Sequence, residues 1–251
     1  MDFLKDLERQ LKEIEGQLAE MGITIEEPDK ETLWNDAEEC FNHAQSLYYK
    51  NELSQAEKFY KRSIKLGNID AYREIGNMYY IDYDDADKAA EWYKKGIEAG
   101  DFQCYFYLGS VCLSLDMLEI EECSRAWNKF TDEVIQQIEE DGQDSVLDDD
   151  SDIPDLYYQM LRNAVEMSAY HGDEAIEIIT ENHNHKLVIS LCHKYIFSRI
   201  LGRYGLSSTD DIIGIMNLDE DRREELTEML NLCKNCLEYT IDTDNQHFIT
   251  D

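Results

Sequence analysis

The sequence contains very little proline and glycine, the two residues that most often interrupt regular secondary structure. Its 251 residues include 2 prolines and 12 glycines, and so few breakers favour long helices over a strand-rich fold. Strand-like alternation of polar and apolar residues is scarce, whereas apolar residues recur at helical spacing along most of the chain. These patterns predict an all-α fold.

Basic residues are also scarce. There are 23 lysines and arginines against 56 acidic residues, which gives a formal net charge of -33. A surface this negative repels nucleic acid and anionic membranes and attracts basic proteins or cations. We therefore expect a basic protein partner, no direct nucleic-acid binding and no membrane binding. The alternative is that the acidity serves solubility alone.

Long apolar runs are missing as well. No run approaches the length of a transmembrane helix, and the first residues lack the basic segment and apolar core of a secretory signal. The cysteines are odd in number and scattered over helical faces, which is typical of free thiols in a reducing compartment. A cytoplasmic location is expected. The seven cysteines are Cys40, Cys104, Cys112, Cys123, Cys192, Cys233 and Cys236.

Residues 1–25 predict an amphipathic helix. Its apolar residues alternate at spacings of three and four, at Leu4, Leu7, Leu11, Ile14, Leu18 and Met21. Three heptads are the minimum for a coiled coil. Two interpretations stay open, a helix that caps the following array and a coiled-coil helix that forms a homodimer.

Residues 33–138 carry an internal repeat. Displacing the sequence by 33 residues aligns Ala56, Tyr60, Lys61, Ile64, Gly67, Tyr72 and Gly76 with Ala89, Tyr93, Lys94, Ile97, Gly100, Tyr105 and Gly109. A fixed period of this length indicates an array of helix-turn-helix units. We expect Gly76 and Gly109 where the two helices of a unit cross, and Gly67 and Gly100 as left-handed helix C-caps.

The repeated residues resemble known helical repeats. Ala44, Leu47, Ala56 and Tyr60 are similar to the pattern of a tetratricopeptide repeat. The next unit resembles a Sel-one-like repeat more closely, at Ala71-Tyr72, Ile75-Gly76, Tyr79, Asp85, Lys88-Ala89, Trp92-Tyr93 and Gly100, continued by Cys104-Tyr105, Leu108-Gly109 and Trp127. The resemblance implies a short α-solenoid in which the first helix of each hairpin lines a concave face.

That face supplies the predicted partner-binding residues. Tyrosine, arginine and asparagine often anchor protein interfaces, although the tyrosines have the alternative role of packing between repeats. Arg73 and Asn77 resemble part of the carboxylate clamp of some tetratricopeptide domains, but the other basic residues of that clamp are missing. The predicted residues are Asn42, Gln45, Tyr48, Tyr49, Arg73, Asn77, Tyr80, Phe106, Ser110 and Leu113.

Two further segments follow the repeats. Nine of the 17 residues in 139–155 are acidic and none is basic, which predicts a solvated flexible linker. A calcium loop is the alternative, but the required order of ligands is absent. Residues 156–251 predict a C-terminal helical domain that either continues the solenoid or packs separately. Its helices are expected near 156–170, 173–182, 186–204, 210–216 and 219–240.

Histidines and cysteines in this last segment raise the alternative of a metal site. His183, His185, Cys192 and His193 lie near one another in sequence, and Cys233-x-x-Cys236 follows on a later helix. The cysteine pair lies inside one helix without the turn of a zinc knuckle. We interpret these residues as buried thiols and polar loop histidines, and expect no metal and no cofactor.

No catalytic motif for a nucleophile, nucleotide or metal is present in the sequence. The sequence therefore predicts a non-enzymatic interaction module, acting as a scaffold, adaptor or inhibitor. A toxin or nuclease would be a suitable basic partner, as for an immunity protein or anti-defence inhibitor. The alternative is a metal-dependent or hydrolytic enzyme with its site in the C-terminal helical domain.

Overall fold

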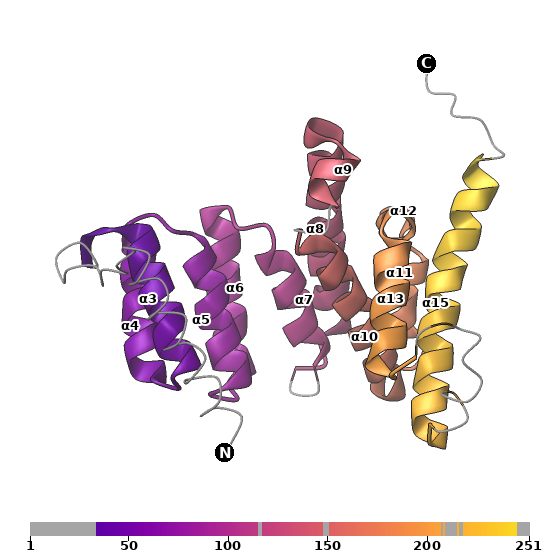
Figure 1. Ribbon diagram of the computed structural model, residues 1–251, viewed down its shortest axis with the longest axis horizontal. Helices are drawn as coiled ribbons and strands as arrows, with labels where there is room; N and C mark the ends of the chain where they lie inside the picture. The colour runs from indigo at the N-terminus through magenta and orange to yellow at the C-terminus, as the bar shows by residue number, and fades with distance from the viewer. Residues whose placement is uncertain are drawn as a thin grey trace, which may run out of the picture. The chain divides into compact units, whose positions relative to one another are not determined.

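The computed structural model is all-helical in the part of the chain that it describes. Every regular element there is an α-helix, which confirms the predicted fold class (Figure 1). None of the described helices combines the length and apolar composition that crossing a membrane requires. The predicted helix at 1–25 and nearly all of the one at 210–216 lie outside the described residues. The described residues are 34–114, 117–147, 151–206, 208, 215 and 218–244.

The chain divides into two compact units, Met1–Asn68 and Ile69–Asp251. In the first, α3 (Ala37–Tyr49) and α4 (Leu53–Lys65) pack as a helical pair. The Asp36 carboxylate caps α3 by accepting the backbone N–H groups of residues 38 and 39 at 2.9 and 3.0 Å. Ala44 and Ala56 are fully buried, and small residues such as these allow two helices to approach closely.

The second unit begins with two helical pairs. Helix α5 (Asp70–Ile81) packs on α6 (Ala86–Ala99), and α7 (Cys104–Leu113) packs on α8 (Ile120–Asp141). Helix α6 also contacts α7, so the two pairs adjoin. The short helix α9 (Gln143–Val146) follows and packs on α8.

Glycines lie at close contacts between the helices of the α5/α6 and α7/α8 pairs. A Cβ atom on Gly76 would lie 2.7 Å from Cδ1 of Tyr93, and one on Gly109 would lie 2.6 Å from Nε1 of Trp127. Both glycines therefore occupy the crossing positions that the repeat predicted. Gly100 has a φ of 99° and forms the left-handed cap of α6, as the sequence also predicted.

The C-terminal helices belong to the same compact unit as α5 to α8. They are α10 (Ile153–His171), α11 (Glu174–Thr180), α12 (His183–Leu191), α13 (His193–Arg203) and α15 (Glu220–Asp244). Helix α10 packs on α7, and α12 packs on α8. One cluster of buried apolar side chains extends from α6 to α15.

The segment at 139–155 therefore does not separate two compact units. Helix α8 continues to Asp141, α9 covers 143–146, and α10 starts at Ile153 with Pro154 in its first turn. Residues 148–150 lie outside the described part. The predicted linker is thus helical at both ends, because buried side chains such as Val146 and Ile153 hold its flanks against the core.

The predicted helix at 186–204 is two helices. Helix α12 ends at Leu191 and α13 starts at His193, with Cys192 between them at φ -101° and ψ 17°. The Cys192 thiol donates to the carbonyl oxygen of Val188 at 3.1 Å. No proline or glycine marks this break, so the apolar spacing continues through it.

Candidate functional site

Helices α5, α7 and α10 enclose a groove of about 510 Å³, here called the α5–α7–α10 groove. Its walls combine tyrosine rings, side-chain amides and apolar side chains with one guanidinium and one carboxylate group. Such a mixture of aromatic, amide and charged groups suits recognition of a peptide or protein segment. The lining includes Asn77, Tyr80, Ile81, Tyr107, Ser110, Gln159, Arg162, Asn163, Glu166 and Met167.

Three predicted partner-binding residues meet at this groove with their side chains at least partly exposed. These are Asn77 and Tyr80 on α5 and Ser110 on α7. The Asn77 carbonyl oxygen accepts the Tyr93 hydroxyl at 2.8 Å, which fixes the orientation of the amide. The Ser110 hydroxyl donates to the Phe106 carbonyl at 3.1 Å. The repeat pattern therefore brings these residues together from two helical pairs.

Two other predicted residues are core residues. Leu113 is fully buried and Phe106 is 1% exposed. The Phe106 ring packs against Trp127 with their centroids 6.5 Å apart and reaches the groove only as part of its floor. Helix α7 is covered by α6, α8 and α10, so the face that was predicted to meet a partner is largely occupied by the protein itself. We therefore withdraw Leu113 and Phe106 as partner-binding residues.

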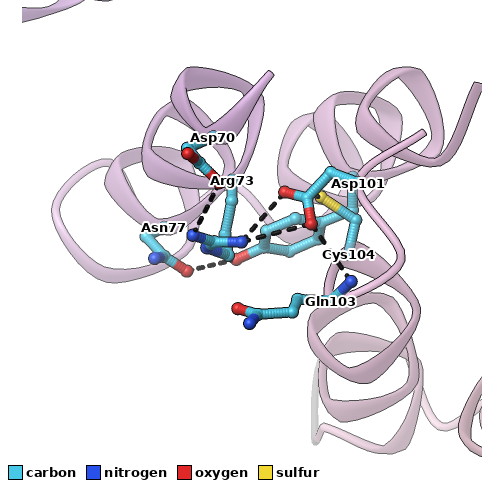
Figure 2. Close-up of polar contacts among 7 residues, drawn as sticks. Asp70, Arg73, Asn77, Asp101, Gln103 and Cys104 are labelled. Atoms are coloured by element: carbon cyan, nitrogen blue, oxygen red, sulfur yellow. Dashed lines mark hydrogen bonds and ion pairs between the residues drawn. The ribbon is translucent and has the colours of Figure 1, made fainter. Parts of the chain in front are cut away.

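Arg73 holds α5 to the N-terminus of α7 (Figure 2). Its Nη1 donates to Asp101 Oδ2 at 3.0 Å, and its Nη2 pairs with Asp70 Oδ1 at 3.2 Å. Asp101 is 4% exposed and also accepts the Gln103 backbone N–H at 3.1 Å and the Cys104 thiol at 3.3 Å. The Arg73 charge is thus compensated within the protein, and the structure gives it a structural role in place of the predicted partner contact.

The other four predicted residues belong to the first unit. Tyr49 is 83% exposed and its ring lies 6.0 Å from that of Tyr48, while the Asn42 amide donates to a neighbouring glutamate at 3.4 Å. Gln45 is half-buried on the same helix, α3. These side chains remain candidates within their own unit.

The α10 wall of the groove was missed by the sequence prediction. Gln159, Arg162, Asn163 and Glu166 line the groove from this helix. The sequence prediction placed this helix in the C-terminal helical domain and left open whether that domain continues the solenoid. The signal that could have found them is the buried stripe that includes Ala164. The first helix of a further repeat unit would likewise be amphipathic, of this length, and would carry a small residue at this position.

Burial changes the protonation behaviour of two groups near the groove. Desolvation raises the pKa of Tyr107 to about 12, so its hydroxyl stays protonated and can donate a hydrogen bond. Desolvation also raises the pKa of Glu74, which lies one turn before Asn77 on α5. The Arg162 guanidinium faces Glu166, with Nε 3.2 Å from Oε1.

A second, smaller groove of about 380 Å³ lies between α8 and α11. Four glutamates line it, and none of them has an ion-pair partner within the described ranges. Isoleucine, serine and asparagine side chains complete the lining. The groove concentrates negative charge without compensation on this side of the unit. The glutamates are Glu121, Glu174, Glu177 and Glu181.

A chain of hydrogen bonds crosses the core between α8, α10 and α12. The Tyr157 hydroxyl donates to Thr131 Oγ1 at 2.7 Å, and Thr131 Oγ1 lies 2.8 Å from His185 Nδ1. His185 Nε2 lies 3.0 Å from Asn128 Oδ1. Because the Asn128 oxygen can only accept, Nε2 carries the proton of the neutral ring, and Nδ1 accepts the Thr131 hydroxyl.

His185 is therefore a buried core residue and not the polar loop residue that the sequence predicted. It is fully buried in the first turn of α12, and desolvation lowers its pKa to about 3. Burial likewise raises the pKa values of Cys192 and Cys236 to about 12 and that of Cys233 to about 11. Within the described ranges, no three histidine, cysteine or acidic side chains are grouped to hold a metal ion.

The His185 pKa predicts a loss of stability in acid. Between pH 6.5 and about 3 the unfolded chain binds a proton at this histidine that the folded chain does not, so stability falls as the pH decreases. Urea unfolding at pH 7.5 and pH 5.5 should show the wild type losing about 1.4 kcal/mol more than His185→Gln. Carboxylates titrate in both proteins and cancel in this comparison. An equal loss in both would mean that His185 is accessible to protons in the folded state.

Comparison with known proteins gives no family for the chain. No protein-family model and no curated protein matches it. A function is therefore inferred from the side chains of the α5–α7–α10 groove and from the charge around them.

Proposed function

We propose that this chain is a non-enzymatic protein-binding module that holds a segment of a partner in the α5–α7–α10 groove. The observation that carries the proposal is the groove itself, in which side chains from three helices surround about 510 Å³. We further propose that α5/α6 and α7/α8 are tetratricopeptide-like or Sel-one-like units of a short α-solenoid. The matched positions of Gly76 and Gly109 against an aromatic ring of the partner helix support that assignment.

The chemistry of the groove supports recognition of a protein segment over a small apolar ligand. Tyr80 and Tyr107 offer aromatic surface, and Gln159 and Asn163 offer side-chain amides. Exposed apolar surface continues at the rim, where Ile81 is 67% exposed. Aromatic anchors surrounded by polar groups are typical of interfaces between proteins.

The charge of the chain supports a basic partner. The formal net charge is -33, and the groove between α8 and α11 adds a local concentration of glutamates without ion pairs. Such a field accelerates encounter with cationic proteins and disfavours nucleic acid and anionic membranes. The module would act as a scaffold, adaptor or inhibitor, for example of a basic toxin or nuclease in the cytoplasm.

A photo-crosslinker in the groove tests the proposal. We expect p-benzoylphenylalanine in place of Tyr80 to capture a protein in native lysate, because this position lines the groove. The matched control carries the crosslinker in place of Glu98, which is exposed on α6 and does not line the groove. Mass spectrometry of the adducts identifies the partner. Adducts that are absent, or equally abundant from both positions, would contradict binding in the groove.

A further inference from the structure

Arg162 contributes the guanidinium group to the lining of the α5–α7–α10 groove. It lies on α10, and its side chain is 35% exposed, so a ligand in the groove can reach it. Its Nε atom is buried, and none of the residues that the structure describes accepts a hydrogen bond from Arg162. A buried N–H group without an acceptor has lost its water without compensation, so an acceptor supplied by a ligand stabilises it.

Glu166 does not satisfy this donor. Its Oε1 atom lies 3.2 Å from Arg162 Nε, which is within ion-pair distance, but the pair lacks the geometry of a hydrogen bond. The same oxygen accepts a hydrogen bond from Arg203 Nη2 at 3.3 Å, and Arg203 also pairs with Glu225 at 3.0 Å. The charge of Arg162 is thus only partly compensated, and its N–H groups stay available to a ligand.

Two side-chain amides line the groove beside Arg162, those of Gln159 and Asn163 on the same helix. Their nitrogens donate within the protein, to Asp155 Oδ2 at 2.8 Å and to Ser110 Oγ at 3.2 Å. Their carbonyl oxygens accept no hydrogen bond from the described part of the chain. These oxygens suit the backbone N–H groups of a bound segment.

The position of Arg162 along the groove favours contact with a side chain of that segment over contact with its end. The α10 wall extends from Gln159 to Met167, which at about 1.5 Å per residue is roughly 12 Å. An extended segment of about four residues spans that length. Because Arg162 lies inside this stretch, a segment that follows the wall continues past the guanidinium in both directions.

A carboxylate is the acceptor that matches Arg162 best. The guanidinium presents its N–H groups in a planar fork that a carboxylate can accept in pairs, and such charge-assisted hydrogen bonds are stronger than neutral ones. Tyr107 adds a further donor to the lining, since its hydroxyl has no hydrogen-bond partner among the described residues. The groove therefore combines donors for a carboxylate with acceptors for peptide N–H groups.

We propose that the α5–α7–α10 groove recognises an aspartate or glutamate side chain within a linear segment of its partner, with Arg162 as the specificity-determining residue. The carboxylate accepts the N–H groups of Arg162, and the oxygens of Gln159 and Asn163 accept backbone N–H groups of the same segment. The inference rests on the proposed function, since it names the chemistry that the groove selects. It is compatible with a basic partner, because net charge governs encounter whereas one acidic residue fixes the register of the bound segment.

Selection from a random display library of 12-residue peptides tests this inference. Arg162→Gln removes the charge from the groove. The control, Arg125→Gln, removes the same charge from a side chain on α8 that is 72% exposed, pairs with a neighbouring glutamate and does not line the groove. We expect enrichment of aspartate or glutamate with the wild type and with Arg125→Gln, and its loss with Arg162→Gln. General attraction to a chain of net charge -33 favours basic peptides instead, so it cannot produce this enrichment.

A neutral isostere then isolates the charge. In a selected peptide, replacing the enriched acid by its amide should weaken binding to the wild type about tenfold or more, since a charge-assisted hydrogen bond is lost. The same replacement should have little effect on binding to Arg162→Gln. An equal loss with both proteins would overturn the role of Arg162. Should Arg162→Gln fail to give the wild-type circular dichroism spectrum and melting curve, Arg162→Met takes its place in the same comparison.

The source of the carboxylate is tested with the same peptide, synthesised with a free and with an amidated C-terminus. We expect equal affinities, because the side chain supplies the carboxylate. A loss of binding on amidation would assign the site to a terminal carboxylate and overturn the inference.

The outcomes separate this inference from the proposed function. Peptides that depend on Tyr80 for binding but show no preference for an acidic residue overturn the inference and leave the groove as a binding site. Peptides that bind equally well to Tyr80→Ala, or no enriched peptides at all, overturn both.

Discussion

Gly109→Leu is expected to lower the free energy of unfolding of the second unit by about 3 kcal/mol or more. A Cβ atom at this position would already lie 2.6 Å from Nε1 and 3.0 Å from Cγ of Trp127. Trp127 is fully buried, and its Nε1 donates to the Phe106 carbonyl at 3.1 Å. Displacing the ring therefore adds the loss of a buried hydrogen bond to the usual cost of overpacking.

Gly202→Leu is the matched control for this substitution. Gly202 lies in α13, and no side chain or distant backbone atom comes within 4 Å of a Cβ placed there. This change should be neutral or stabilising by up to about 1 kcal/mol, because glycine is a poor helix former. Urea unfolding followed by tryptophan fluorescence measures both. Similar stabilities for the two variants would mean that α7 and α8 do not cross at Gly109.

Asp101→Ala is expected to destabilise the second unit by about 3 kcal/mol. The substitution leaves the largely buried Arg73 guanidinium with only the more exposed Asp70, and it removes the acceptor for the Gln103 backbone N–H (Figure 2). Breaking a largely buried pair by deleting one partner leaves an uncompensated charge and is strongly destabilising.

Asp70→Ala serves as the control, because it removes a carboxylate that is 53% exposed from the same arginine. Its cost should stay below about 1 kcal/mol. Thermal and urea unfolding of the two variants give the comparison. If Asp101→Ala were as mild as Asp70→Ala, Arg73 would not be held as the structure places it, and it would be available to a partner.

The repeat period located the helix crossings because a steric requirement acts at one residue per unit. Gly76 and Gly109 each lie against a large ring of the neighbouring helix, and only a residue without a side chain satisfies that contact. Periodicity could not locate the break at Cys192. The apolar spacing passes through it unchanged, and the thiol bond to Val188 that accompanies it involves no residue type typical of helix ends.

The candidate site was predictable in part, for a similar reason. The 33-residue repeat indicated which face of α5 and α7 would be available to a partner. That was sufficient to identify Asn77, Tyr80 and Ser110, which line the groove. It could not indicate what covers that face. Helix α10, which follows α8 and α9 in the sequence, packs on α7 and supplies Asn163 to the groove. Leu113 is fully buried in the same core.

The most direct test of binding in the α5–α7–α10 groove uses two tyrosine variants of this protein. It measures their affinity for the partner that is crosslinked at position 80. Tyr80 lines the groove, whereas Tyr170 is 62% exposed on α10 and does not line it. By titration calorimetry we predict that Tyr80→Ala weakens binding about tenfold or more, as for an interface anchor, and that Tyr170→Ala leaves the Kd within about twofold. Wild-type affinity of a fully folded Tyr80→Ala protein would contradict binding in the α5–α7–α10 groove.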